Sequence, residues 1–337
     1  MHVHSTAPAP CTLHVHSTAP APCTLHVHPC VPIVYYAARM KLTRRELGRT
    51  VLAATVLAPL ARTTAQTGSR VAGVRIGAQT WIFRDRPLEQ VPAALQKAGL
   101  GFVELWSGHV ESDARTGIEQ GIARDARRER LRTWRLSTPL SSFREIRTAF
   151  ANAGVTLTSY DIPYRDDWTD EEILRSFEMA DALGVKAITS SAGLSVVPRL
   201  AKLVGRADLT IAFHNHSTIR ENEFATPDDL TSALKVSSKM GVTLDIGHFT
   251  AANFDAVKFL EEHHARIHAL HVKDRKKDQG AGVPLGEGDA PVKQVLRLLR
   301  DRNWDIPAHI EFDYRPADPV AEAAKGYAYC RTVLETK

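Results

Sequence analysis

Four side chains of this 337-residue sequence have the types needed to bind a divalent metal ion. Imidazole nitrogen and carboxylate oxygen are ligands for Mn²⁺, Co²⁺ and Zn²⁺, and carboxylates also suit Mg²⁺. Carboxylates gathered at one place without a cation would repel one another or take up protons. We therefore predict one divalent ion, Mn²⁺, Co²⁺, Zn²⁺ or Mg²⁺, held by His214, Asp245, His271 and Glu311.

Each of these residues also has an ordinary structural interpretation. A single His at the end of a strand is usually a hydrogen-bonded residue, and Asp245 before Ile246 could cap a turn. Glu104 could pair with an arginine inside the fold. His309 precedes Glu311 by two residues, so we expect it on the same side of its strand but one layer deeper, outside the ligand set. Only the set of four favours a metal site.

The elements that must position these side chains follow a regular pattern. Eight short runs rich in Val, Ile, Thr and aromatic residues predict β-strands, and segments with helical periodicity separate them. Gly99, Gly184 and Gly241 stand just before predicted strands, where helices commonly end. The predicted strands are residues 74–81, 102–106, 155–160, 185–190, 209–214, 242–246, 267–272 and 307–312.

This alternation predicts an α/β fold, a single-domain (β/α)8 TIM barrel over residues 66–337. A doubly wound open sheet is the alternative, but it usually carries a glycine-rich phosphate loop after its first strand, which is missing here. In a barrel, the C-terminal ends of the strands converge on one mouth, so the four predicted ligands would meet there. We expect the charged stretch 111–140 to add a helix and a loop over this mouth.

Residues 1–39 predict a disordered leader. The sequence HVHSTAPAPCTL occurs at 2–13 and again at 14–25, and such a Pro-, Ala- and Thr-rich repeat cannot bury a core. The repeat region holds three of the four cysteines and six of the fifteen histidines, which leaves a metal-binding tract open. Its exact duplication favours instead a duplicated DNA segment translated from an incorrect start codon.

Residues 40–65 resemble a twin-arginine export signal. Arg44 and Arg45 precede an apolar stretch, 51–61, that is too short to span a bilayer comfortably. We therefore expect an exported, periplasmic protein that begins near Gln66 and has no membrane segment after cleavage; a short amphipathic helix is the alternative. Only Cys330 would then remain, so no internal disulfide can form.

The charge distribution argues against a nucleic-acid partner. The chain has 43 Lys and Arg against 38 Asp and Glu, but residues 1–65 hold six of the basic residues and only one acidic residue. The rest therefore has 37 of each and is neutral, whereas nucleic-acid binding proteins usually carry a basic surface. We expect a small carbohydrate as partner, and the sequence leaves open whether the chain forms a homo-oligomer.

The chain from residue 74 resembles the xylose isomerase-like TIM barrel superfamily, in its sugar phosphate isomerase and epimerase branch. That resemblance implies one divalent metal at the ends of strands five to eight, with Asp245, His271 and Glu311 on three of the ligand positions. The fourth falls on His214, where many relatives have Glu followed by Asn-His. The segments that carry the resemblance are GFVELW (101–106), TIAFHNHS (210–217), VTLDIGHF (242–249), HALHVKDR (268–275), VPLGEGDAPV (283–292) and HIEFDY (309–314).

The function implied is a metal-dependent sugar isomerase or epimerase, in which proton removal next to a carbonyl gives an enediolate. Glu311 is the expected base, with His214 or His216 as its partner. Lys273 could stabilise an anionic oxygen, and Glu104 completes the catalytic candidates.

Three alternatives remain at this point. A 3-keto-glycoside lyase would use the same metal site for β-elimination, and export favours free glycosides over phosphorylated sugars as substrates. The His at position 214 leaves room for a catalytically inactive sugar-binding barrel. A DNA repair enzyme similar to endonuclease IV would need more ligands and a basic face, which the neutral charge argues against.

Overall fold

The computed structural model describes residues 68–111, 123–205 and 207–336. The predicted leader 1–39 and the predicted export signal 40–65 lie outside the described residues, as does most of the loop expected within 111–140.

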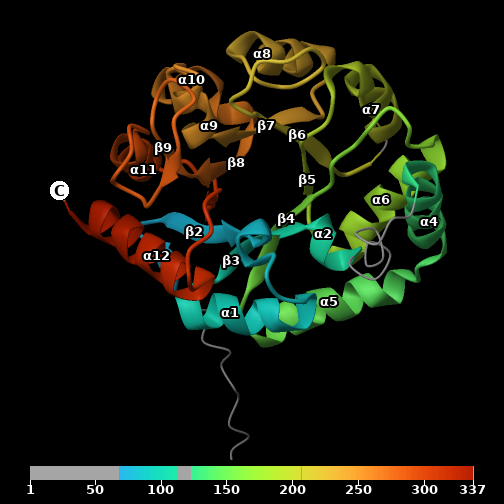
Figure 1. Ribbon diagram of the computed structural model, residues 1–337, viewed down its shortest axis with the longest axis horizontal. Helices are drawn as coiled ribbons and strands as arrows, with labels where there is room; N and C mark the ends of the chain where they lie inside the picture. The colour runs from blue at the N-terminus through green and yellow to red at the C-terminus, as the bar shows by residue number, and fades with distance from the viewer. Residues whose placement is uncertain (1–67, 112–122, 206, 337) are drawn as a thin grey trace, which may run out of the picture. The chain divides into compact units, whose positions relative to one another are not determined.

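Eight parallel strands form a closed barrel, as predicted (Figure 1). Neighbouring strands follow one another around the barrel in chain order, and β11 pairs with β2 to close it. The barrel strands are β2 (Val74–Gln79), β3 (Phe102–Trp106), β4 (Thr156–Asp161), β5 (Ala187–Ser190), β6 (Thr210–His214), β7 (Met240–Asp245), β8 (Ile267–Val272) and β11 (Ala308–Ile310).

Three further strands were not predicted. β1 (Arg70–Val71) pairs antiparallel with the start of β2. β9 (Asp274–Arg275) and β10 (Gly282–Val283) form a separate antiparallel pair in the segment that follows β8.

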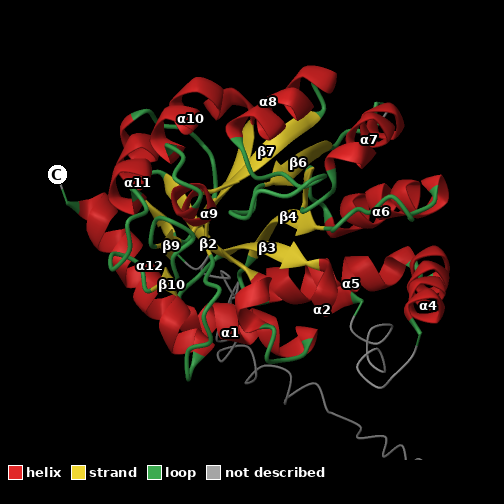
Figure 2. Cartoon of the chain, turned by 45° about the horizontal axis from the view of Figure 1, so that its top comes forward, coloured by secondary structure: helices red, strands yellow, loops and turns green. Residues whose placement is uncertain are grey.

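Helices lie outside the ring of strands (Figure 2). One of them, α4 (Arg124–Ser137), confirms the extra helix expected within 111–140. The 3-10 helices are η1 (Thr80–Phe83), η2 (Leu88–Gln90), η4 (Leu194–Val196) and η5 (His264–Arg266). The other α-helices are α1 (Val91–Ala98), α2 (Ser107–Val110), α5 (Leu140–Asn152), α6 (Asp170–Leu183), α7 (Val197–Val204), α8 (Pro227–Val236), α9 (Ile246–Ala251), α10 (Ala256–His263), α11 (Val292–Asp301) and α12 (Pro319–Glu335).

Some helix ends are stabilised by hydrogen bonds or backbone conformations that the sequence predicts. Thr169 and Glu172 form a reciprocal capping box at the start of α6. Gly99 and Gly184 end α1 and α6 in the left-handed conformation, as predicted. Gly241 was expected at a helix end but lies inside β7, where a Cβ would come 2.3 Å from Cδ2 of His268, so the close approach of that ring requires glycine.

The strands are buried on both faces, as expected for a parallel sheet covered by helices. Every residue of β5 and β7 is buried, and one apolar core joins the strands to the surrounding helices. Within the described part of the chain, no helix is both long and apolar enough to traverse a bilayer.

Candidate metal centre

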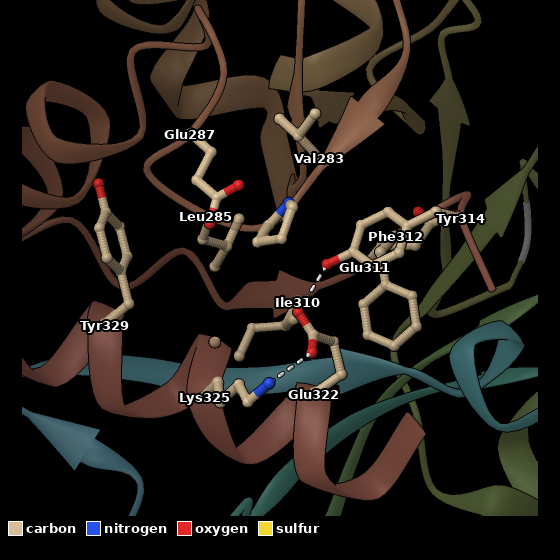
Figure 3. A pocket seen from close by; sticks show the side chains of 12 residues that line it. Val283, Leu285, Glu287, Ile310, Glu311, Phe312, Tyr314, Glu322, Lys325 and Tyr329 are labelled. Carbon is tan, nitrogen blue, oxygen red and sulfur yellow. Dashed lines mark hydrogen bonds and ion pairs between the residues drawn. The ribbon is translucent and has the colours of Figure 1, made fainter. Parts of the chain in front are cut away.

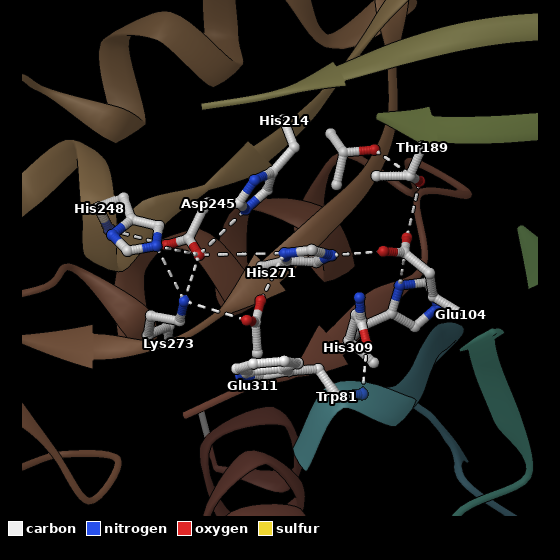
Figure 4. A network of polar contacts seen from close by, with 12 residues as sticks. Trp81, Glu104, Thr189, His214, Asp245, His248, His271, Lys273, His309 and Glu311 are labelled. Carbon is white, nitrogen blue, oxygen red and sulfur yellow. Dashed lines mark hydrogen bonds and ion pairs between the residues drawn. The ribbon is translucent and has the colours of Figure 1, made fainter. Parts of the chain in front are cut away.

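The four predicted ligands meet at the C-terminal ends of four consecutive strands (Figure 4). His214 ends β6, Asp245 ends β7, His271 is the penultimate residue of β8, and Glu311 directly follows β11. One ligand atom from each lies within 4.8 Å of the others, and each residue is at most 7% exposed. The barrel therefore assembles the nitrogen and oxygen set that the sequence predicts.

Asp245 is held rigidly at the centre of this group. Its Oδ1 caps α9 by accepting the backbone N–H of His248 at 2.7 Å. The side-chain amide of Asn215 bonds both the backbone N–H and the backbone carbonyl of Asp245, at 2.9 and 3.1 Å. Oδ2 is thereby directed toward the ligands, 3.4 Å from Nε2 of His214 and 3.9 Å from Nδ1 of His271.

His271 lies between two carboxylates. Its Nε2 is 2.9 Å from Oε1 of Glu104, and its Nδ1 is 2.6 Å from Oε2 of Glu311. Nδ1 of His271 and Oε2 of Glu311 are both buried. They lie close together, but neither atom has a hydrogen-bond partner among the described residues. When Nε2 of a neutral imidazole donates its proton, Nδ1 carries a lone pair. A carboxylate–histidine pair with the second nitrogen free is the usual arrangement at a metal ligand, so these residues fit a divalent ion.

The charges of the site also favour a bound cation. The buried ammonium of Lys273 lies 3.0 Å from Asp245 Oδ2, 3.2 Å from Glu311 Oε1 and 2.9 Å from Asp313 Oδ1. One lysine thus faces three carboxylates, with Glu104 beneath them as a fourth. Buried charges need compensation, and a divalent cation would supply it.

The ionisation of the ligands is set by their neighbours. Burial would raise the pKa of Asp245, but His248 and Lys273 outweigh it and hold that pKa well below its ordinary value. Burial would lower the pKa of His271, but Glu104 and Glu311 outweigh it and hold that pKa well above its ordinary value. A metal at Nδ1 would therefore displace a proton from His271, as metal binding to histidine does in general.

Glu104 lies one layer below the site. It is fully buried, and its Oε2 accepts hydrogen bonds from Ser159 at 2.9 Å and Thr189 at 2.8 Å. Its link to the ligands passes through His271. His309 is also fully buried, with Nε2 2.9 Å from the hydroxyl of Thr158 and Nδ1 3.7 Å from Oε2 of Glu104.

His216 borders the site, and no described residue forms a hydrogen bond with its ring. Its ring centre is 5.1 Å from that of His214 and 5.7 Å from that of His248. Burial, with smaller effects of His214 and Lys273, lowers the pKa of His216 to about 4, so the ring is neutral at neutral pH. His248 receives a hydrogen bond at Nδ1 from Arg275, at 2.8 Å.

A cavity of about 480 Å³ opens over the ligands, which is a common size for a small-molecule site. The rings of Trp81 and Trp106 meet edge to face on its wall, 4.9 Å apart. The cavity residues contributed by the β2–β5 side had no predicted role, because single polar or aromatic residues at strand ends carry no ligand pattern. Those residues are Gln79, Trp81, Trp106, Asp161, Pro163, Arg165, Thr189 and Ser191.

A second hollow, of about 250 Å³, lies between α12 and the segment 283–287 (Figure 3). Its polar groups satisfy one another, since Glu322 accepts the hydroxyl of Tyr314 at 2.9 Å and the ammonium of Lys325 at 3.3 Å. Of the four predicted ligands only Glu311 lines it. The larger cavity is therefore the candidate site.

Comparison with known proteins agrees with this architecture. The family described as xylose isomerase-like TIM barrel matches residues 92–333. An inosose dehydratase of Clostridium perfringens is 24% identical over 165 residues, which are 42% of this chain and 53% of the relative. The chain thus spans about half the length of the curated relatives it matches.

Two solved structures share the fold over most of their length. The 3-keto-D-glucoside 4-epimerase YcjR of E. coli superposes with a TM-score of 0.57 at 14% identity, covering 77% of this chain and 99% of that one. The IolI protein with a bound zinc atom superposes with a TM-score of 0.58 at 13% identity, covering 78% and 100%. At these identities the likeness concerns the fold.

Proposed function

Because the chain belongs to the xylose isomerase-like TIM barrel family, we propose that it is a divalent-metal-dependent sugar isomerase or epimerase. The proposed reaction begins with removal of a proton from the carbon next to a carbonyl group. The observation that carries the proposal is the pair formed by His271 Nδ1 and Glu311 Oε2. Both atoms are buried, 2.6 Å apart and without a hydrogen-bond partner among the described residues.

The metal would be held by the four ligands His214, Asp245, His271 and Glu311. A bound divalent ion supplies Lewis-acid stabilisation of the negative charge that develops on the substrate oxygens. The zinc atom bound in the similarly folded IolI structure supports the proposal of a divalent metal, and metal analysis distinguishes among Mn²⁺, Co²⁺, Zn²⁺ and Mg²⁺.

The chain's own groups have distinct tasks in this proposal. Glu311 accepts the carbon-bound proton, with Oε1 oriented by Lys273 at 3.2 Å. The ammonium of Lys273 also compensates negative charge beside the substrate. His216 is neutral and lines the cavity, so it can exchange a proton with the substrate. Trp81 and Trp106 offer an apolar wall to one face of a sugar ring.

The names of similar proteins support proton removal next to a carbonyl. Epimerisation at C4 of a 3-keto-glucoside and dehydration of an inosose can both start with this step. We propose a small keto sugar or glycoside as the substrate. From residues 40–65 we also propose that the protein acts after export, in the periplasm.

The replacement Glu311→Gln tests the base. The wild-type protein should exchange the proton next to the carbonyl of a keto sugar for solvent deuterium, and the variant should lose this exchange by about 100-fold or more. Glu287→Gln is the matched control, because Glu287 is exposed and lines the other hollow. Undiminished exchange in Glu311→Gln would remove Glu311 from the role of base.

A second function uses the same metal site. A 3-keto-glycoside lyase would expel the glycosidic oxygen after the proton has left. The histidine at position 214 favours it, since an imidazole there does not supply a second carboxylate for two-carboxylate proton exchange, and the inosose dehydratases are elimination enzymes by name. Product analysis with 3-keto-glucosides separates the two functions: a released aglycone means elimination, and an altered stereocentre means epimerisation.

Metal analysis tests the ligand set itself. Purified protein should contain Mn, Co, Zn or Mg near one equivalent, and the double variant Asp245→Ala/His271→Ala should lose it. Asp228→Ala/His263→Ala is a control of the same residue types away from the site. Metal retained by Asp245→Ala/His271→Ala would contradict the site. Wild-type protein that binds the metal but shows no deuterium exchange would favour a sugar-binding barrel without turnover.

A further inference from the structure

The rim of the cavity has two unlike halves. All four predicted ligands come from β6, β7, β8 and β11, which are consecutive in the barrel. A substrate held at those ligands must extend toward the other half, formed by the ends of β2 to β5. Among the described residues that line this half, Asp161 is the one with a carboxyl group.

Asp161 is the last residue of β4, and β4 lies across the closed barrel from β8, which carries His271. The side-chain amide of Gln79 holds it, with Nε2 donating to Oδ2 at 2.9 Å. The amide cannot flip, because its Oε1 accepts the backbone N–H of Trp81 at 2.5 Å. The other oxygen, Oδ1, has no hydrogen bond or ion pair within the part of the chain that the structure describes. Asp161 itself lines the cavity.

The surroundings favour the neutral form of this carboxyl group. Burial and, next, the charge of Glu104 raise the pKa of Asp161 well above its ordinary value. Arg165 lines the same cavity, but its guanidinium donates to the backbone carbonyls of Tyr164 and Ser191 rather than to Asp161. A carboxyl group that keeps its proton and has one oxygen free of hydrogen bonds can donate that proton to a molecule held in the cavity it lines.

We propose that Asp161 is a catalytic acid, which protonates the substrate from the side of the cavity opposite the metal ligands. This inference rests on the proposed function and deepens it. It gives the site a second proton-transferring carboxyl group besides Glu311, which the imidazole of His214 does not supply.

The proton balance is simple. The substrate C–H bond breaks, its proton goes to Glu311, and its electron pair forms the carbon–carbon double bond of the enediolate. The O–H bond of Asp161 then breaks, and its proton forms a new C–H bond on the other face, which gives epimerisation. In the elimination variant, that proton goes instead to the leaving oxygen as the C–O bond breaks. Exchange with water restores both carboxyl groups.

The replacement Asp161→Asn tests this role, because asparagine keeps an oxygen that can accept from Gln79. With a 3-keto-glucoside as probe, the variant should keep deuterium exchange and metal content within about threefold of wild type. Product formation should fall by about 100-fold or more. Product formation within about threefold of wild type, or an equal loss of exchange and product, would overturn the proposal.

A second readout does not depend on turnover. The infrared spectrum of the resting protein at neutral pH should contain the carbonyl stretch of a protonated carboxylic acid, which disappears in Asp161→Asn. Asp289→Asn is the matched control, because Asp289 is exposed and ionised and should leave the band unchanged. If wild type lacks the band, Asp161 is ionised and the proposal fails. A protein that shows the band but exchanges no deuterium would instead disprove the proposed function.

Discussion

Glu104 and His271 meet across the barrel, with Glu104 Oε1 2.9 Å from His271 Nε2. They come from β3 and β8, which are not neighbours in the sheet. This contact holds the ring so that Nδ1 faces Asp245 and Glu311. Glu104, a catalytic candidate from sequence, therefore contacts the predicted ligands through His271, and we expect it to act as a positioning residue.

Glu104→Gln should weaken metal binding without abolishing it. Glutamine can still accept the Nε2 proton but lacks the charge that raises the basicity of the ring. Loss of such a partner typically lowers metal affinity about 10- to 100-fold. Competition with a chromophoric chelator measures the affinity, with the exposed Glu89→Gln as control. Equal affinity in the two variants would show that Glu104 does not support the ligand.

Lys273→Met should destabilise the metal-free protein. The ammonium lies within 3.2 Å of three carboxylate oxygens, and its removal leaves buried negative charge without compensation. The expected loss is about 3–5 kcal/mol of unfolding free energy, measured by denaturant titration. A divalent ion should restore part of it. The control is Lys186→Met, which breaks an exposed pair with Asp208 and should change little. Similar losses in both variants would contradict the charge argument.

Glu172→Gln should give a pH-dependent loss of stability. Glu172 pairs with Arg128 and, at 3.2 Å, with Arg135. Burial alone would raise the pKa of Glu172, but these arginines and the backbone N–H of Thr169 lower it to about 2. A depressed acid pKa stabilises the fold above the ordinary value of 4.5, and this contribution is lost as pH falls toward 2.

The difference in unfolding free energy between wild type and Glu172→Gln should therefore be about 2 kcal/mol at neutral pH. It should shrink steadily in acid, and thermal or denaturant unfolding across this pH range measures it. Glutamine can keep the capping bond to Thr169, so the change isolates the charge. The control is Glu171→Gln, which changes the exposed residue next to Glu172 in sequence. A difference that does not vary with pH would show that packing, not charge, is responsible.

Replacing both Arg44 and Arg45 by Lys should block export. The prediction follows from the sequence of residues 40–65, which lie outside the described residues. A fluorescent reporter fused behind residue 65 should reach the periplasm with the native sequence and stay in the cytoplasm with the double replacement. Lys41→Arg is the control, because it leaves the arginine pair intact. Equal periplasmic signal from the native sequence and from the double replacement would contradict twin-arginine export.

Much of the barrel was predictable from local pattern. Most barrel strands are short apolar runs that are largely buried, and composition shows this without knowledge of neighbours, although β4 is more polar and partly exposed. Local pattern misplaced one boundary: Gly241, expected at a helix end, lies in β7, where the ring of His268 leaves no room for a Cβ. β9 and β10 were missed because strands of two residues carry no periodicity.

Local pattern in the sequence was enough to predict the order of strands and helices and the residue types at the strand ends, and with them the candidate ligands His214, Asp245, His271 and Glu311. Which other polar side chains lie near these four residues depends on the tertiary structure. It buried Lys273 among three carboxylates, put Glu104 behind His271, and placed Asp161 on the far wall with one free oxygen. Sequence periodicity reports which face of an element is buried, whereas contacts between distant strands depend on barrel closure and register.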